Sequence, residues 1–150
     1  MIQSRDEYVA RIGTANQSQL VLITYELLLS HLDTALSAPV EYCPHTERAR
    51  MAINALMGGL DMSQGVAGEL LPIYMFIDRL LVRAYFSGDT SPLIEAREHC
   101  LELYKILKLA EEGLNDNSPK SSTEVYAGLT YGRDGLSEYV IQDGARTFKG

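Results

Sequence analysis

Residues 16–37 read NQSQLVLITYELLLSHLDTALS, and this stretch decides the fold. On a helix with about 3.6 residues per turn, its apolar residues form two stripes rather than one. The broader stripe, typical of the core face of a bundle helix, consists of Val21, Tyr25, Leu28, Leu29, Leu32, Ala35 and Leu36. The second stripe lies nearly opposite and consists of Leu20, Ile23 and Leu27, with Thr24 and His31 beside it. A helix with two apolar faces must bury both, against its own chain or against a partner.

Helical periodicity continues on both sides of this stretch. A short segment near Arg5–Gly13 precedes it, and Thr14 or Asn16 can cap the long helix by accepting a bond from an early backbone N–H. Pro39 ends the long helix. Three further helices are predicted. The first runs from about His45 to Met57, the second ends at Ser87–Gly88, and the third runs from Ser91–Pro92 to Gly113. Gly58–Gly59 ends the first of these three, because glycine accepts the left-handed conformation of a C-terminal cap.

Each of these segments has an apolar stripe that we expect to face the core. In chain order the stripes are Tyr8, Val9 and Ile12; Ala49, Ala52, Ile53 and Leu56; Leu70, Ile73, Tyr74, Ile77, Leu80, Leu81 and Ala84; and Leu93, Ala96, Cys100, Leu103, Tyr104, Leu107 and Ala110. The helix that ends at Ser87–Gly88 also has a second apolar face, which Asp78 interrupts and which consists of Leu71, Met75, Val82 and Phe86. This helix either starts at Leu71–Pro72 or is bent there.

The fold class follows from this order of segments. Short connections favour antiparallel neighbours, and no stretch alternates long enough to predict a sheet. We therefore predict an all-α, antiparallel up-down bundle of four main helices and a short N-terminal helix, over residues 1–114. Residues 115–150 hold several glycines and tyrosines without sustained periodicity, so a flexible tail with one turn of helix near Ser137–Ile141 is expected.

Composition excludes several function classes. The net charge is −7, with 13 Lys and Arg spread among 20 Asp and Glu, which argues against nucleic-acid binding. No apolar run approaches the roughly 20 residues that span a bilayer, so no membrane insertion is expected. The N-terminal residues lack the apolar core of a secretory signal, and only two cysteines are present, which fits a reducing compartment. These features predict a cytoplasmic protein.

Catalytic and metal-binding motifs were not found. Zinc sites need paired ligands at short, regular spacing, and neither Cys43–Pro44–His45 nor His99–Cys100 provides it. Surface histidines and buried thiols are the expected alternative. No nucleophile elbow or phosphate-binding glycine loop occurs. The stripe Glu95, Glu98 and Glu102 has no accompanying E-x-x-H pair and indicates a solvated acidic face. We predict neither enzyme activity nor a metal or other cofactor.

Short motifs along the chain resemble the flagellar export chaperone FliS family. That family typically has a tyrosine, then "TASP", then a helix that opens with "QLI" or "ELI" and contains "LYD". Here Tyr8 is followed by Thr14-Ala15-Asn16-Gln17, Gln19-Leu20-Val21 and Thr24-Tyr25-Glu26, and later by Ile53, Leu56, Leu60-Asp61, Leu70, Ile73-Tyr74, Leu80 and Ala84. The resemblance covers residues 8 to about 112. Asn16-Gln17 replaces the usual Ser-Pro, and the tryptophan common near the end of the last helix is absent.

The resemblance implies a cytoplasmic chaperone that binds the disordered C-terminal part of flagellin, prevents premature polymerisation and delivers it to an export gate component of the flagellar secretion apparatus. It also implies that Tyr8 and Ile12 belong to an N-terminal segment that borders or covers the client groove. From the surplus apolar faces, independently, we expect Leu20, Ile23, Leu27, Met75 and Val82 to line that groove.

Two alternatives stay open at the level of sequence. Both faces of the long helix can be core, because a central bundle helix touches several neighbours. The chain can also be a structural bundle that self-associates through the same faces and has no flagellin client.

The tail, with its several tyrosines and aliphatic residues, could fold back over the groove until a client displaces it.

Overall fold

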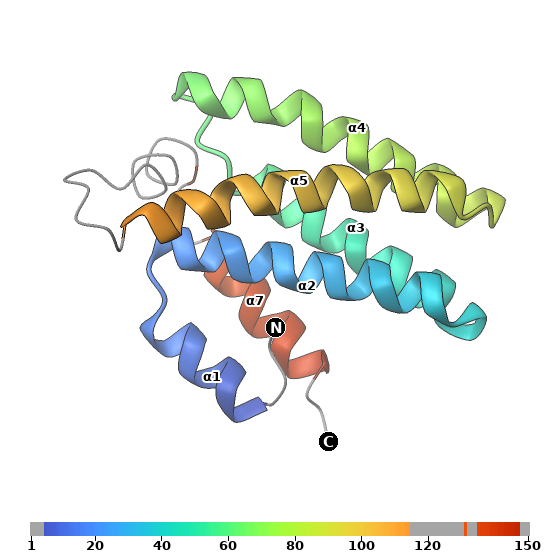
Figure 1. Cartoon of the computed structure of the whole chain (residues 1–150), viewed down its shortest axis with the longest axis horizontal. Coiled ribbons are helices and arrows are strands. Elements are labelled where there is room, and N and C mark those ends of the chain that lie inside the picture. Colours follow the sequence, from blue (N-terminus) through green and yellow to red (C-terminus); the bar gives the residue numbers. More distant parts are fainter. Residues whose placement is uncertain (1–4, 115–130, 132–134, 148–150) are drawn as a thin grey trace.

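The computed structural model describes residues 5–114, 131 and 135–147, and these form a bundle of helices (Figure 1). In chain order they are α1 (Arg5–Thr14), α2 (Gln17–Ser37), the 3₁₀ turn η1 (Pro39–Glu41), α3 (Tyr42–Gly58), α4 (Gly65–Ser87), α5 (Ser91–Leu114) and α7 (Gly135–Thr147). Within these described ranges there is no β-strand, and a single isolated bridge joins Leu60 to Tyr131.

Helices α2 to α5 form the body of the molecule and run alternately up and down (Figure 1). Helix α2 packs against α3 and α5, and α4 packs against the same two helices from the other side, so α2 and α4 face each other across the core. The described side chains that fill this core include Leu28, Leu32, Ile53, Ile77 and Leu93. The predicted all-α up-down bundle is therefore confirmed.

The predicted start of α2 is also confirmed. Asn16 Oδ1 accepts a hydrogen bond from the Gln19 backbone N–H at 2.9 Å, and the Gln19 side chain accepts one from the Asn16 N–H at 2.9 Å. This reciprocal capping box satisfies two donors that the first turn of a helix leaves unpaired. Helix α3 begins at Tyr42 rather than at His45, because Pro44 falls in its first turn, where the N–H has no partner within the helix.

The prediction for the end of α3 is wrong in its reason. Gly59 has φ −82°, so no left-handed cap is present there; Gly88, after α4, has φ 69° and is the left-handed residue. Gly59 instead provides space. A Cβ added to it would lie 3.1 Å from Tyr131 Cδ1 and 3.6 Å from Leu136 Cγ, which both belong to the C-terminal part of the chain.

Helix α4 starts earlier than Pro72. It begins at Gly65, and Pro72 lies inside it, so the first of the two sequence-based alternatives is wrong. Two residues placed in core stripes are also exposed: Ile73 on α4 by 40 % and Val9 on α1 by 57 %. Each lies at the edge of its stripe, where a shift of one position around the helix turns a side chain outward.

The C-terminal helix α7 is longer than the single turn expected near Ser137–Ile141. It spans Gly135–Thr147 and packs against α1, α2 and α3 (Figure 1). Its docking on the bundle stabilises a helix of which only one turn was expected. The expectation of flexibility for the rest of the tail falls on residues 115–130, 132–134 and 148–150, which lie outside the described part.

Helix α2 is long and apolar enough by length and composition to cross a membrane, which the search for apolar runs did not anticipate. Most of its apolar window is buried inside the bundle. Core helices of soluble proteins pass the same test of length and composition, so this single helix is weak support for a membrane span.

Candidate functional site

Helix α1 is held on α2 by a bidentate ion pair. Arg11 Nη1 and Nη2 donate to the two carboxylate oxygens of Glu26 at 2.7 and 2.9 Å. The Glu26 side chain is buried, and the Tyr104 hydroxyl of α5 donates to it at 3.4 Å. The hydrogen bond to Glu26 is the main reason that the pKa of Arg11 is raised. A paired guanidinium thus fixes the N-terminal helix against the centre of the bundle.

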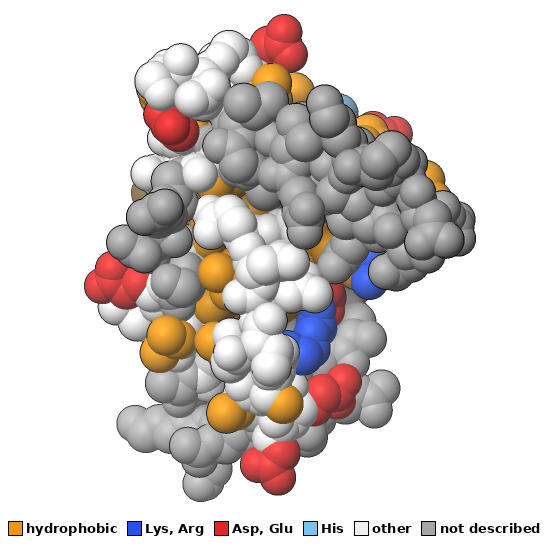
Figure 2. All heavy atoms as spheres, turned by 90° about the vertical axis from the view of Figure 1, so that its left-hand side faces the viewer, with side chains coloured by type: hydrophobic (Ala, Val, Ile, Leu, Met, Phe, Trp, Pro, Cys, Tyr) orange, Lys and Arg blue, Asp and Glu red, His pale blue; other side chains and the backbone are white. Residues whose placement is uncertain are grey.

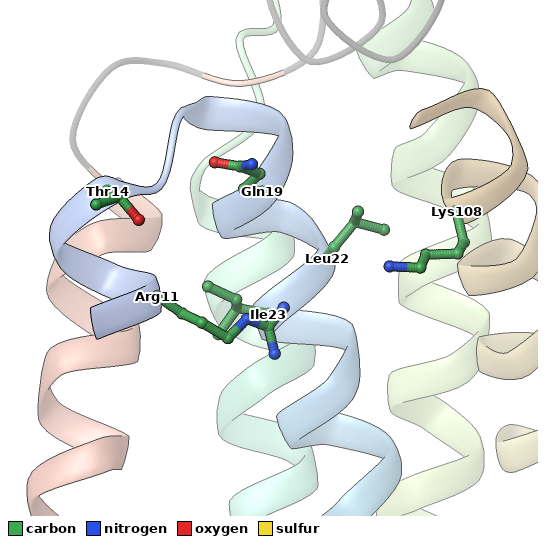
Figure 3. A pocket seen from close by; sticks show the side chains of 6 residues that line it. All are labelled: Arg11, Thr14, Gln19, Leu22, Ile23 and Lys108. Atoms are coloured by element: carbon green, nitrogen blue, oxygen red, sulfur yellow. The ribbon is translucent and has the colours of Figure 1, made fainter. Parts of the chain in front are cut away.

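A cavity of about 230 Å³ opens where α1, the start of α2 and α5 meet (Figure 3). Its lining consists of Arg11, Thr14, Gln19, Leu22, Ile23 and Lys108. Figure 3 shows Lys108 reaching from α5 toward α2, with Arg11 beside Ile23. The cavity therefore combines two cationic side chains with an apolar floor.

The second apolar face of α2 is closed in the free chain. Leu20, Ile23 and Leu27 are all buried, and Ile23 is only 1 % exposed. Tyr8 of α1 is buried as well, and Ile12 is partly buried against the same core. We call these five residues the α1/α2 face. Helices α1 and α7 lie over α2 on the side away from α4, so the cover comes from the chain itself.

The polar contacts that α7 makes with α1 and α2 are buried. The Tyr8 hydroxyl donates to the Val140 carbonyl. His31 Nε2 lies 3.2 Å from both carboxylate oxygens of Asp143, and both side chains are buried. Burial, and then the negative charge of Asp143, raise the pKa of Tyr8 well above its ordinary value. The expectation that the histidines lie at the surface is therefore wrong for His31, because α7 covers it.

The hydrogen-bonded chain continues from His31 to α3. His31 Nδ1 lies 3.0 Å from His45 Nδ1, and His45 Nε2 lies 3.2 Å from Glu41. If His31 donates its Nε2 proton to Asp143, its Nδ1 accepts a hydrogen bond from His45. Burial lowers the pKa of His45, with further lowering by His31 and Arg48, while Glu41 opposes the shift.

Acidification is expected to destabilise the fold through His45. Because its pKa is lowered from 6.5 in the folded chain, the unfolded chain binds this proton at a higher pH than the folded chain does. The contribution of neutral His45 to the free energy of unfolding is complete above pH 6.5. It falls as the pH drops from there toward the pKa of His45 in the folded chain. Urea unfolding at a series of pH values measures this slope. His45→Gln should flatten it, because the titrating group is removed; an unchanged slope in this variant contradicts the assignment.

Met75 and Val82 belong to a different surface. Met75 is 46 % exposed and Val82 is half-buried, and both lie on α4, across the core from α2. Between them, Asp78 accepts a hydrogen bond from Arg50 Nε of α3 at 3.1 Å. Further along the same stripe, Phe86 is 79 % exposed. We call Leu71, Met75, Val82 and Phe86 the α4 face, in which Met75 and Phe86 are exposed and Leu71 and Val82 are partly buried.

Sequence reasoning missed other exposed apolar side chains on α4 and α5. Phe76 is exposed and makes an edge contact with the His99 ring, with the two ring centres 5.5 Å apart. Ile94, Ile106 and Leu109 of α5 are exposed as well. Figure 2 shows that, on the end of the bundle turned to the viewer, apolar side chains lie in separate groups among polar ones. Their spacing could have shown them, since Phe76, Ile94, Ile106 and Leu109 fall outside the predicted core stripes.

Metal ligands and thiols are the described residue types that could carry chemistry. Among the residues that the structure describes, no group of three or more His, Cys, Asp or Glu side chains could hold a metal ion. Burial raises the pKa of the Cys100 thiol to about 12, so this thiol stays protonated. Cys43 is exposed, which corrects the expectation that both thiols are buried. The structure offers apolar surfaces, one closed and one partly exposed.

Comparison with known proteins agrees with this description. A search among curated proteins gave no match. Residues 1–112, from the N-terminus almost to the end of α5, match the family described as "Flagellar protein FliS". The chain therefore belongs to the FliS family of flagellar export chaperones.

Proposed function

We propose that this protein is a cytoplasmic chaperone that binds the disordered C-terminal segment of flagellin, keeps it from polymerising and delivers it to an export gate component of the flagellar secretion apparatus. The observation that carries the proposal is the family match over residues 1–112. This family has a chaperone role in flagellar export, and that role requires a surface for an unfolded client.

The apolar surfaces support a helical client. A flagellin terminus that is disordered as a monomer can fold on binding and bury an apolar stripe in a groove. The α4 face presents Met75 and Phe86 to solvent, and the adjacent Arg50–Asp78 pair can orient polar groups of a peptide. The α1/α2 face has more apolar surface but is covered, so we assign it to client contact only after its cover has moved.

Calorimetric titration with a peptide of the C-terminal segment of flagellin from the same organism tests the proposal. We expect a 1:1 isotherm with a strongly negative heat-capacity change, because coupled folding buries roughly 1,000–3,000 Å² of surface. No binding at tens of micromolar would contradict the proposed function. Light scattering of the free and mixed protein separates the alternative: a stable oligomer that ignores the peptide would indicate a self-associating structural bundle.

Substitution of Met75 by aspartate is expected to weaken peptide binding about tenfold without unfolding the protein. Met75 is already 46 % exposed, so the new carboxylate stays hydrated in the free chain but would be desolvated against an apolar client. The matched control is Met62→Asp, since Met62 is exposed in the α3–α4 loop. Titration of both variants measures the difference. Equal affinity of the two variants would remove Met75 and the α4 face from the binding site.

A further inference from the structure

Helix α7 is bound to the bundle in the manner of a docked peptide. Its inward positions Leu136, Tyr139, Val140, Asp143 and Gly144 are all buried. They follow the spacing i, i+3, i+4, i+7 and i+8, by which an amphipathic helix seats in a groove. Its outward positions Glu138, Ile141 and Gln142 are exposed.

Glycines allow close contact between α7 and the bundle at two separate points. At one end, Gly59 of the α3–α4 connection leaves space for Tyr131 and Leu136. At the other end, a Cβ added to Gly144 would overlap the ring of Tyr8, so the absence of a side chain at residue 144 lets α1 and α7 touch. The contacts on both ends are therefore specific to the docked position.

Helix α7 lies wholly outside the residues that match the family. The match ends at residue 112, whereas α7 begins at Gly135. What α7 covers belongs to the matched part: Tyr8 of α1, His31 of α2 and the α3 end. Leu27 and Leu20 lie one and three turns before His31 on the same side of α2, and they belong to the predicted client groove.

We propose that α7 is an intramolecular competitor of the client: it occupies the groove formed by α1, α2 and α3, and the amphipathic helix of the client replaces it there. This inference rests on the proposed function. The competitor stays tethered through residues 115–134, so it is present at a high effective concentration. A client must bind better than this tethered helix, which protects the α1/α2 face from weaker apolar ligands.

The polar contacts make the docked helix replaceable. The buried His31–Asp143 pair loses hydration on docking, and such a pair adds little net stability compared with an apolar contact of the same size. Release of α7 would return Asp143 to water, and the contact of His31 with His45 involves no residue of α7. Specific position with a modest net gain is what a reversible occupant needs.

Two full-length variants that loosen α7 at opposite ends test the inference. Gly144→Leu places a side chain against Tyr8, and Leu136→Asp puts a charge in a buried site near Gly59. Gln142→Ala, on the exposed side of α7, is the matched control. We expect both loosened variants to bind the flagellin C-terminal peptide about tenfold more tightly or better, and the control to bind like the unmodified chain. Unchanged or weaker binding by folded variants would overturn the inference.

Hydrogen exchange of the unmodified chain gives a test that needs no variant. On addition of the peptide, the amides of residues 136–144 should lose protection while those of α4 and α5 keep it. Binding with α7 still protected overturns this inference and leaves the proposed function intact. Absence of binding by the unmodified chain and both loosened variants overturns both. Binding by the unmodified chain that becomes tighter in both loosened variants supports both.

Discussion

Substitution of Arg11 by alanine is expected to lower the free energy of unfolding by about 2–3 kcal/mol and to release α1 from α2. The change leaves the buried Glu26 carboxylate without the guanidinium that donates to both of its oxygens. A buried charge that loses its partner costs more than the pair contributes, although the partial exposure of Arg11 and the Tyr104 hydroxyl reduce the loss. Chemical denaturation measures the stability, and limited proteolysis within residues 5–14 measures the release.

The reciprocal change provides the control for Arg11. Glu26→Gln removes the charge but keeps the size, and the partly exposed Arg11 can then be solvated. We expect this variant to lose clearly less stability than Arg11→Ala. Equal losses would mean that the pair acts through packing alone, and the ionic account of α1 docking would be wrong. Since α1 carries Tyr8 and Ile12 of the α1/α2 face, both variants also show whether the release of α1 changes the affinity for flagellin.

Substitution of Tyr74 by phenylalanine is expected to cost about 2–4 kcal/mol, because it removes a shared hydroxyl from the middle of the bundle. Tyr74 on α4 lies 2.7 Å from the Tyr25 hydroxyl of α2 and 2.7 Å from that of Tyr131. All three tyrosines are buried. The variant therefore removes one hydrogen bond from each of two buried hydroxyls, one in the core and one in the C-terminal part. Thermal and urea unfolding measure the loss.

Two comparisons sharpen this prediction. Tyr85→Phe on the same helix is the control, since Tyr85 is only half-buried, and its cost should stay within about 0.5 kcal/mol. Alkaline titration gives an independent measure. Burial raises the pKa of Tyr25 well above 10.0. The contribution of protonated Tyr25 to the free energy of unfolding is therefore complete below pH 10.0 and falls as the pH rises above it. The part of the tyrosinate absorbance that comes from Tyr25 should then appear only in step with unfolding; ionisation of all tyrosines in the folded chain would contradict the burial.

The sequence predicted most of the bundle because its helices carry strong local signals. The stripe Ala49, Ala52, Ile53 and Leu56 is fully buried as expected, and Asn16 caps α2 as expected. Both features depend on residues within one or two turns of each other. The local signal at Pro72 had two possible meanings, and α4 runs through this residue; Ile73, expected in the core stripe, is exposed.

Helix α7 was underestimated for a physical reason. It contains Gly144 in its interior, and glycine costs about 1 kcal/mol in a helix, so its own propensity is weak. The same glycine is what lets Tyr8 approach. His31 was expected at the surface for a related reason, since its burial depends on Asp143, which lies 112 positions away in the chain.

By itself, the sequence determined that this protein is an all-α bundle, that α2 has two apolar faces, and that the chain resembles the flagellar export chaperones. Each of these follows from local periodicity or from the order of short motifs. Only the tertiary structure decided what covers the second face of α2. That cover comes from α1 and α7, and the contacts Tyr8–Val140, His31–Asp143 and Tyr74–Tyr131 join residues whose neighbourhood depends on the whole chain being folded.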